Sequence, residues 1–387
     1  MDLTALLGAA VQAGASDLHL KSGNFPTMRL HGVLRPVVED RRLDPNTLDG
    51  IASALIPETL KERFSQEHEV DFAHSVPGLG RFRCNVFRQR GSAALVLRII
   101  PTRIASIDEL ELPEVLKQVA DESRGLVLLT GTTGSGKSTT LAAMVDHVNH
   151  TRASHIMTVE DPIEYLHQDD RSLINQREVD VDTTTFAQAL RSALRQDPDV
   201  ILVGEMRDLE TVETGLTAAE TGHLVMSTVH TLDATETINR LVAVFPPHQQ
   251  RQIRLQLASV LRAIVSQRLL PRTDRTGRVA AVEVLLNTPF VRDCIIDPDR
   301  THLIHGAIAS GTSQYGMQTF DQSIFWLYER GRISFETALA AASNADEFRL
   351  RVQGVSSTAD DARDDMANAR QSPAPPDEGP LVERFGD

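Results

Sequence analysis

Residues 131–138 constrain the fold of this chain more than any other segment. They read Gly-Thr-Thr-Gly-Ser-Gly-Lys-Ser and match G-x-x-x-x-G-K-[ST] at every fixed position. An apolar run at residues 126–130 comes directly before them, and a segment with helical periodicity, residues 138–149, follows. In such a strand–loop–helix unit the backbone N–H groups of the loop surround phosphate, and the helix N-terminus adds partial positive charge. The segment therefore predicts an ATP site.

The residues of this loop have separate predicted tasks. The ammonium of Lys137 is expected to reach the β- and γ-phosphates and to take part in catalysis, and the hydroxyl of Ser138 is expected to ligate Mg²⁺. The full set of predicted ATP-binding residues is Thr133, Gly134, Ser135, Gly136, Lys137, Ser138 and Thr139.

An acidic residue at the end of a second apolar run is the candidate to activate water. Residues 199–205 end in Glu205, and a carboxylate that leaves a strand close to the phosphate loop is placed to polarise the attacking water. The preceding position, where strands of this kind usually carry Asp, is Gly204. The alternative is that Glu205 only forms a surface ion pair with Arg207.

A cluster of acids follows the apolar run at residues 155–159. Glu160 is the candidate there for a catalytic contact to the metal or the nucleophile through water, since the missing Asp leaves the metal in need of other ligands. A turn or capping role for Asp161 and Pro162 is the alternative.

Two histidines and four arginines are candidate phosphate sensors. His223 and His230 flank the run at residues 224–229 and lie next to threonines, which fits a γ-phosphate sensor that signals across a subunit boundary. The alternative is a structural role, since a lone histidine is more often a structural residue than a catalytic one. The arginines are Arg81, Arg83, Arg88 and Arg98, on two strands expected in the first domain. Arginine neutralises phosphoryl charge in transition states, but an exposed arginine can also be merely solvated.

The order of elements predicts two domains. Residues 1–100 contain a first helix and several short strands and predict a small α+β domain on an antiparallel sheet. Residues 101–112 are expected to be a linker. Residues 113–354 alternate apolar runs with helical segments, which predicts a mostly parallel α/β sheet, with a helical part from about residue 288. Residues 355–387 are acidic and are expected to be a disordered tail.

Some elements are expected to be long. Residues 48–65 have a helical pattern. After Pro247 the chain is predicted to be mainly helical, with one apolar stripe on a long helix before a strand at residues 279–285. The stripe consists of Ile253, Leu257, Val260, Leu261, Ile264 and Val265.

Composition excludes several classes. The formal net charge is −14 and aromatic residues make up 4%, which argues against a protein that grips nucleic acid. Two cysteines cannot form a disulfide framework or a four-cysteine zinc site. We find no apolar run of eighteen residues and no secretory signal, so the expected location is the cytoplasm.

Seven motifs in this order resemble the secretion and pilus motor ATPases, and among them the PilT-type ATPases of type IV pilus retraction. They lie at residues 14–20, 81–88, 131–138, 158–165, 203–208, 221–230 and 316–322. The resemblance covers roughly residues 1–370. It implies a PAS-like N-terminal domain, a RecA-like P-loop ATPase domain and a homohexameric ring that closes around ATP. It also implies a peripheral position at the inner membrane, through a platform protein of the pilus.

The direction of such a motor is a separate question. Extension-type relatives usually carry a long N-terminal extension and a four-cysteine zinc insert, and this sequence has neither, which favours retraction. Residues 290–297 read Phe-Val-Arg-Asp-Cys-Ile-Ile-Asp, where many retraction ATPases read Ala-Ile-Arg-Asn-Leu-Ile-Arg-Glu. This departure leaves an accessory retraction motor open.

Other functional classes remain as alternatives. An extension or secretion ATPase and a DNA-transfer ATPase share the phosphate loop. A non-catalytic ATP sensor is a further alternative, although such a sensor would be expected to lose the acid that this chain keeps at Glu205.

Overall fold

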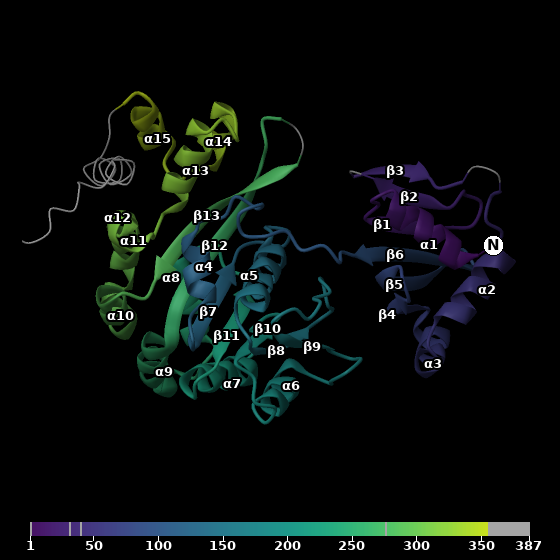
Figure 1. The fold of residues 1–387 in the computed structure, drawn as a ribbon, viewed down its shortest axis with the longest axis horizontal. Coiled ribbons are helices and arrows are strands. Elements are labelled where there is room, and N and C mark those ends of the chain that lie inside the picture. The colour runs from purple at the N-terminus through teal and green to yellow at the C-terminus, as the bar shows by residue number, and fades with distance from the viewer. Residues whose placement is uncertain (1, 31, 39–40, 275–276, 355–387) are drawn as a thin grey trace, which may run out of the picture.

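The computed structural model describes residues 2–30, 32–38, 41–274 and 277–354, and these form a small and a large domain (Figure 1). The segment 355–387, expected to be a disordered tail, lies outside the described residues. Each domain has its own sheet and its own apolar core.

The small domain is built on a six-stranded antiparallel sheet in the order β3-β2-β1-β6-β5-β4. Its strands are β1 (Asp17–Leu20), β2 (Thr27–Leu30), β3 (Val33–Pro36), β4 (Glu69–Val76), β5 (Gly80–Gln89) and β6 (Ser92–Ile100), and its helices are α1 (Leu3–Gln12), α2 (Pro45–Leu55) and α3 (Glu58–Glu67). Along β5 the side chains of Phe82, Cys84 and Val86 are buried in the core. Because neighbouring side chains of a strand point to opposite faces, Arg81 and Arg83, which alternate with them, lie on the other face of the sheet.

The helical pattern at residues 48–65 forms two helices and not one. α2 ends at Leu55, and Ile56 has an extended backbone (φ −65°, ψ 123°). A residue that precedes proline is disfavoured in the helical region, and Pro57 then caps α3. The stretch with a helical pattern is therefore interrupted at Ile56 and Pro57.

The large domain is built on a seven-stranded sheet in the order β13-β12-β7-β11-β10-β8-β9. Its strands are β7 (Gly125–Thr130), β8 (His155–Glu160), β9 (Leu173–Glu178), β10 (Val200–Val203), β11 (Leu224–Val229), β12 (Leu261–Pro271) and β13 (Arg278–Leu286). All neighbouring pairs are parallel except β12 with β13.

Helices cover both faces of this sheet, and the sequence of β7 reflects it. Leu126 and Leu128 belong to one apolar core, whereas Val127 and Leu129 belong to the other. A strand buried on both faces needs a continuous apolar run rather than an alternating one. The helices are α4 (Val115–Ala120), α5 (Lys137–Thr151), α6 (Phe186–Ala193), α7 (Leu209–Glu220), α8 (Ala234–Ala243), α9 (Pro247–Val260), α10 (Pro289–Ile296), η1 (Pro298–Leu303), α11 (Ile304–Ser310), α12 (Thr312–Tyr315), α13 (Phe320–Glu329), α14 (Phe335–Ala341) and α15 (Ala345–Val352).

The prediction of one long helix after Pro247 is wrong. α9 ends at Val260, and the apolar residues from Leu261 onward form strand β12, which lies between β7 and β13. Residues 263–267 of β12 are all buried, and in such a buried run the helical and extended periodicities cannot be told apart. The edge strand β9, whose sequence is mostly polar, was not expected either.

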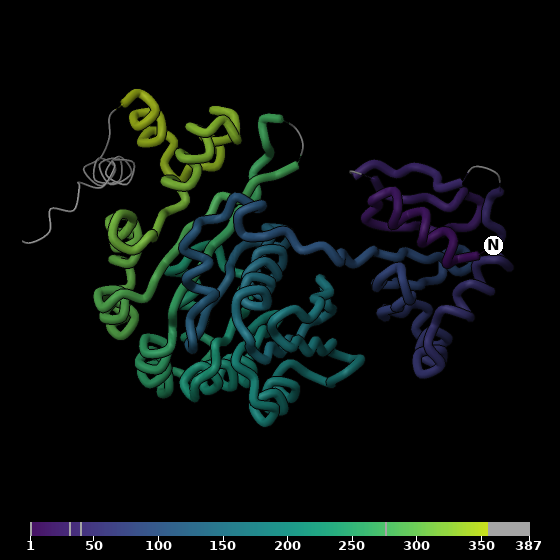
Figure 2. Tube along the Cα trace, in the orientation of Figure 1, coloured from purple at the N-terminus to yellow at the C-terminus, as the bar shows by residue number. Residues whose placement is uncertain are grey.

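The connection between the domains is shorter than the segment 101–112. Ile107 and Leu112 are buried in the large domain, where they pack with α4 and the sheet. Only residues 101–106 therefore pass between the domains (Figure 2). Pro101 is itself tied to the large domain, because its carbonyl accepts a hydrogen bond from the backbone N–H of Leu166 at 3.4 Å.

The two cysteines yield a simple test of the packing. Cys84 and Cys294 are both fully buried, and burial raises the pKa of the Cys84 thiol to about 12. At pH 8 this thiol is protonated and unreactive, so the native protein should resist a thiol-specific chromogenic reagent until denaturant is added. Ser65→Cys, which places a thiol at an exposed position of α3, is the control that should react at once. Rapid reaction of the unaltered native protein would contradict this packing.

Candidate nucleotide-binding site

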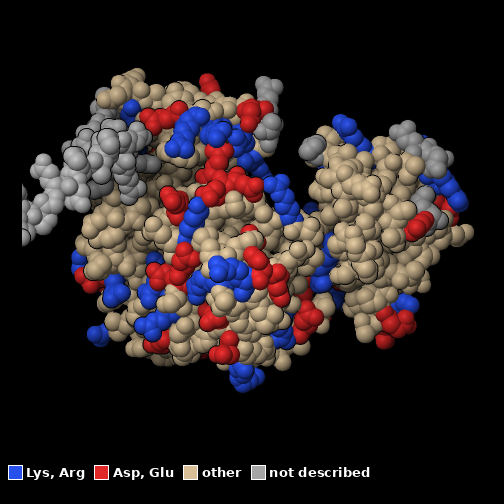
Figure 3. All heavy atoms as spheres, in the orientation of Figure 1, with Lys and Arg blue, Asp and Glu red and all other residues tan. Residues whose placement is uncertain are grey.

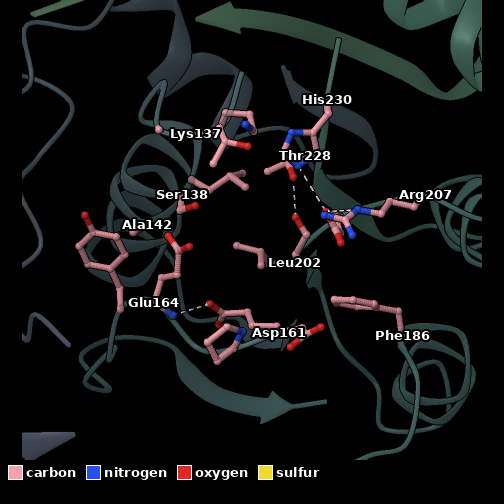
Figure 4. Close-up of a pocket in the computed structure, with 18 of the residues that line it drawn as sticks. Lys137, Ser138, Ala142, Asp161, Glu164, Phe186, Leu202, Arg207, Thr228 and His230 are labelled. Carbon is pink, nitrogen blue, oxygen red and sulfur yellow. Dashed lines mark hydrogen bonds and ion pairs between the residues drawn. The ribbon is translucent and has the colours of Figure 1, made fainter. Parts of the chain in front are cut away.

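A pocket of about 390 Å³ lies at the carboxyl ends of four neighbouring parallel strands, β7, β8, β10 and β11. The side chains that follow these strands meet at one edge of the sheet, which is where ligands bind in open α/β sheets. The lining consists of Arg83, Thr133, Gly134, Lys137, Ser138, Leu141, Ala142, Glu160, Asp161, Pro162, Glu164, Tyr165, His167, Phe186, Leu202, Gly204, Glu205, Arg207, Thr228 and His230. In Figure 4, Lys137 and His230 lie along one side of the pocket, and Asp161 and Phe186 along the opposite side.

The loop after β7 is folded tightly around the ammonium of Lys137. This group donates hydrogen bonds to the carbonyls of Gly131 (2.9 Å) and Thr132 (3.0 Å). A Cβ at Gly131 would lie 2.4 Å from the carbonyl oxygen of Gln267, so only glycine fits there. The buried hydroxyl of Ser135 has no hydrogen-bond partner among the described residues. A buried cation and an unused hydroxyl in one loop fit an anion such as phosphate.

Two opposing effects act on Lys137. Burial lowers the pKa of its ammonium, whereas the nearby carboxylates of Glu164 and Glu205 raise it. No carboxylate oxygen lies within ion-pair distance of this ammonium among the described residues. The positive charge is therefore available to a ligand in the pocket.

Glu205 follows β10 and is held by two nitrogen-bearing side chains. Its Oε2 lies 2.6 Å from Nε of Arg207 and 3.4 Å from Nε2 of His230. Against the opposing effect of Glu205, burial and the charge of Lys137 lower the pKa of His230 below its ordinary value, and this shift favours the neutral imidazole. The hydroxyl of Thr228 donates to the carbonyl of Gly204 at 2.7 Å and fixes the peptide that precedes Glu205.

The position before the acid lies between β8 and α6. A Cβ at Gly204 would lie 3.4 Å from both the Cα of Glu160 and the Phe186 ring, which is van der Waals contact. Backbone packing alone therefore does not explain why Gly and not Asp precedes Glu205.

Glu160 is a carboxyl group fixed by hydrogen bonds. Its Oε1 accepts from the hydroxyl of Thr158 (2.7 Å) and the amide of Gln176 (3.1 Å), and its Oε2 accepts from the backbone N–H of Glu164 (3.3 Å). Burial raises the pKa of Glu160, and these hydrogen bonds oppose that effect. The structure therefore brings Glu160 and Glu205 to the same pocket as Lys137 and Ser138.

The four candidate arginines have different surroundings. Arg83 lines the pocket from the small domain, and Arg81 forms an ion pair with Glu178 of the large domain at 2.9 Å. Arg88 and Arg98 do not line the pocket. They pair inside the small domain, Arg88 with Asp49 at 3.8 Å and Arg98 with Asp17 at 3.0 Å. Basic side chains lie along the facing edges of the two domains in Figure 3.

The two candidate histidines lie apart. His230 lines the pocket, whereas His223 precedes β11, whose six residues span about 20 Å. The ring Nδ1 of His223 is 2.9 Å from the carbonyl of Ala218, near the end of α7. The structure thus gives His223 a contact at a helix end and does not bring it to the pocket.

Two contacts at the site, made by Gln267 and Tyr165, could not be predicted from local sequence patterns. Gln267, on β12, accepts a hydrogen bond from the hydroxyl of Thr140 at 2.9 Å and supports the phosphate loop from behind. The hydroxyl of Tyr165 contacts that of Thr139 at 2.8 Å. These partners are distant in the sequence, although Tyr165 closes the motif at residues 158–165.

The residues present fit a nucleoside triphosphate with Mg²⁺. The loop offers backbone N–H groups and an ammonium to phosphate, and Ser138 and Glu160 offer the oxygen ligands that Mg²⁺ prefers. When bound, Mg²⁺ would neutralise charge on the phosphates.

Two pilus ATPases are similar to this chain in sequence along most of its length. The chain is 46% identical over 352 residues to the "Type IV pilus retractation ATPase PilT" of Pseudomonas aeruginosa, which covers 90% of this chain and 100% of that protein. It is 42% identical over 361 residues to the "Type IV pilus ATPase PilU" of the same organism, which covers 93% of this chain and 94% of that protein.

A solved structure matches both domains. The crystal structure of the pilus retraction motor PilT with bound ADP has a TM-score of 0.82 and 44% identity, and covers 90% of this chain and 98% of that one. The match confirms the predicted fold class, a PAS-like α+β domain followed by a RecA-like P-loop ATPase domain. A family model described as "Type II/IV secretion system protein" matches residues 1–324. The chain is therefore an ATPase and belongs to the type II/IV secretion system protein family.

Proposed function

We propose that this chain is an ATP-hydrolysing motor that works as a ring of six copies and powers the retraction of type IV pili in twitching motility. One observation carries the proposal. The chain aligns with the whole length of a pilus retraction ATPase, and Lys137, Ser138 and Glu205 line one pocket at the edge of its sheet.

The proposed roles follow the geometry of the pocket. Lys137 and the backbone of residues 133–139 bind the phosphates, and Ser138 ligates Mg²⁺. Glu205 orients the water that attacks the γ-phosphate, while Glu160 contacts the metal or that water. His230 lies against Glu205 and is placed to sense a change at the phosphates.

The small domain contributes to the same reaction. Arg83 lines the pocket from β5, so nucleotide can draw the small domain toward the large one.

We place the ring at the cytoplasmic side of the inner membrane, bound to a platform protein of the pilus. Among the described residues no helix combines the length and apolar character that crossing a membrane requires.

An accessory retraction motor is the second candidate. The similarity to PilU covers 93% of this chain, and residues 290–297 lack the final Arg-Glu pair found in many retraction ATPases. Deleting an accessory motor should leave part of the retraction intact, whereas deleting the principal motor should abolish it.

Replacing Lys137 with Ala should weaken ATP binding at least about tenfold. A hydrogen bond to a charged group contributes about 1.5–3 kcal/mol, and about 1.4 kcal/mol corresponds to tenfold in affinity. Titration with a fluorescent ATP analogue measures the Kd. Lys61→Ala removes an exposed lysine that pairs with Glu58 of α3, and it should bind as the unaltered protein does. If Lys137→Ala and Lys61→Ala bind equally well, the phosphate role of Lys137 is wrong.

Replacing Glu205 with Gln separates binding from turnover. The amide keeps the shape of the side chain but cannot activate water as a carboxylate does. ATP affinity should change little, whereas kcat should fall by about 100-fold or more. In cells that carry this variant in place of the native protein, surface pili should accumulate and twitching should stop. Cells without pili would instead indicate an extension motor, and unchanged turnover would remove Glu205 from catalysis.

A further inference from the structure

Arg81 joins the two domains through a nearly buried ion pair. Its Nη2 donates to Oε2 of Glu178, on the last residue of β9, at 2.9 Å. The side chain of Glu178 is 5% exposed and that of Arg81 is 18% exposed. Removing one partner while the domains keep this arrangement leaves the other charge buried without compensation, so the two residues depend on each other here.

Glu178 also holds the loop that carries the pocket acids. The Oε2 that accepts from Arg81 also accepts from the backbone N–H of Ile163 at 3.2 Å. The next residue, Val179, donates its N–H to the carbonyl of Glu160 at 2.9 Å. One carboxylate thus connects an arginine of the small domain to the segment between Glu160 and Glu164.

This loop has a second link to the domain junction. The N–H of Leu166 donates to the carbonyl of Pro101, the residue that leaves β6 toward the large domain. Residues 161–167 are therefore linked to Arg81 of the small domain through Glu178 on one side of Glu164, and to Pro101 at the start of the connection between the domains on the other side. A rotation of the small domain against the large one must therefore move Glu178 and this loop or break the Arg81–Glu178 pair.

We propose that the Arg81–Glu178 pair is a latch between the domains, which sets the position of Glu160 and Glu164 according to the domain arrangement. Arg81 is then a positioning residue that acts through Glu178, and it does not contact phosphate. This inference rests on the proposed ATPase function.

The alternative is that Arg81 turns to the phosphates when ATP binds. Such a movement would leave the carboxylate of Glu178 buried with only the N–H of Ile163 as its partner in this part of the structure. Arg83 lies two residues away and already lines the pocket. The positive charge that the small domain offers to phosphate can therefore come from Arg83, while Arg81 stays on Glu178.

A double-mutant cycle distinguishes the two roles. The variants are Arg81→Ala, Glu178→Ala and the combination of both, with Glu178→Gln as a variant of the same shape. For each, kcat and KM of ATP hydrolysis, the Kd of a fluorescent ATP analogue and Tm are measured. A misplaced catalytic group costs about 10- to 100-fold in rate, so each single variant should lower kcat by that factor, with the Kd changed less than about threefold.

The double variant shows whether Arg81 and Glu178 affect kcat as a pair or independently. If the two residues act as a pair, the combined variant should be no slower than the slower single variant. Glu178→Gln should also lose turnover, because the neutral amide weakens the latch. If Arg81 contacts phosphate instead, Glu178→Gln frees it, and kcat should stay equal or rise; this result, or additive losses in the double variant, would overturn the proposal.

The domain arrangement provides a readout independent of turnover. Fluorophores on Ser65→Cys of α3 and Ser310→Cys of α11 report the distance between the domains, because both positions are exposed and the native cysteines are buried. Labelled copies are diluted into unlabelled ones. Arg81→Ala should shift or broaden the distance distribution, and an unchanged distribution contradicts a latch.

A matched control variant distinguishes a failure of the latch proposal from a failure of the motor proposal. Arg103→Ala removes an exposed ion pair with Glu109 at the domain junction and should leave kcat and the distance distribution unchanged. If the unaltered protein hydrolyses ATP and Arg81→Ala matches it in kcat and in domain distance, the latch is wrong and the motor proposal stands. If the unaltered protein does not hydrolyse ATP, the motor proposal itself fails.

Discussion

The burial of the central strands restricts where charged side chains can lie in the large domain. Side chains along β7, β10 and β11 are buried on both faces, so charged groups can lie only where these strands end. Because the strands are parallel, their carboxyl ends meet at one edge, and Lys137, Glu205 and His230 all follow strands that finish there. The pocket therefore depends on the hydrogen-bond ladder of the sheet more than on any one side chain.

The charges in the pocket are balanced against burial. The ammonium of Lys137 loses hydration, which lowers its pKa, and the carboxylates of Glu164 and Glu205 oppose this effect. Burial raises the pKa of Glu160, yet three hydrogen bonds favour its carboxylate form. Groups held in this way need little reorganisation when charge develops on a phosphate, which is the main way that enzymes stabilise such transition states.

The parts of the site that sequence reasoning located are those with local patterns. The loop around Lys137 has a fixed spacing, and Glu205 ends an apolar run, so both could be placed at strand ends from the sequence alone. β12 was not recognised, because a buried apolar run such as residues 263–265 fits a strand as well as a helix, and Gln267 behind the loop was missed with it. The partner of Arg81 is 97 residues away, and no local pattern identifies such a contact.

The attachment of Leu166 to Pro101 places the nucleotide pocket next to the point where the domains turn. Coupling between two sites is reciprocal in free energy: whatever ATP does to the angle between the domains, an imposed angle does to the binding of ATP. In a motor of the proposed kind, tension in the filament would be transmitted through the small domains to the loop at residues 161–167. A ring stalled under load would then bind ATP with a different affinity from a ring without load. Mechanical load would thereby regulate the rate of ATP hydrolysis without a separate regulatory site.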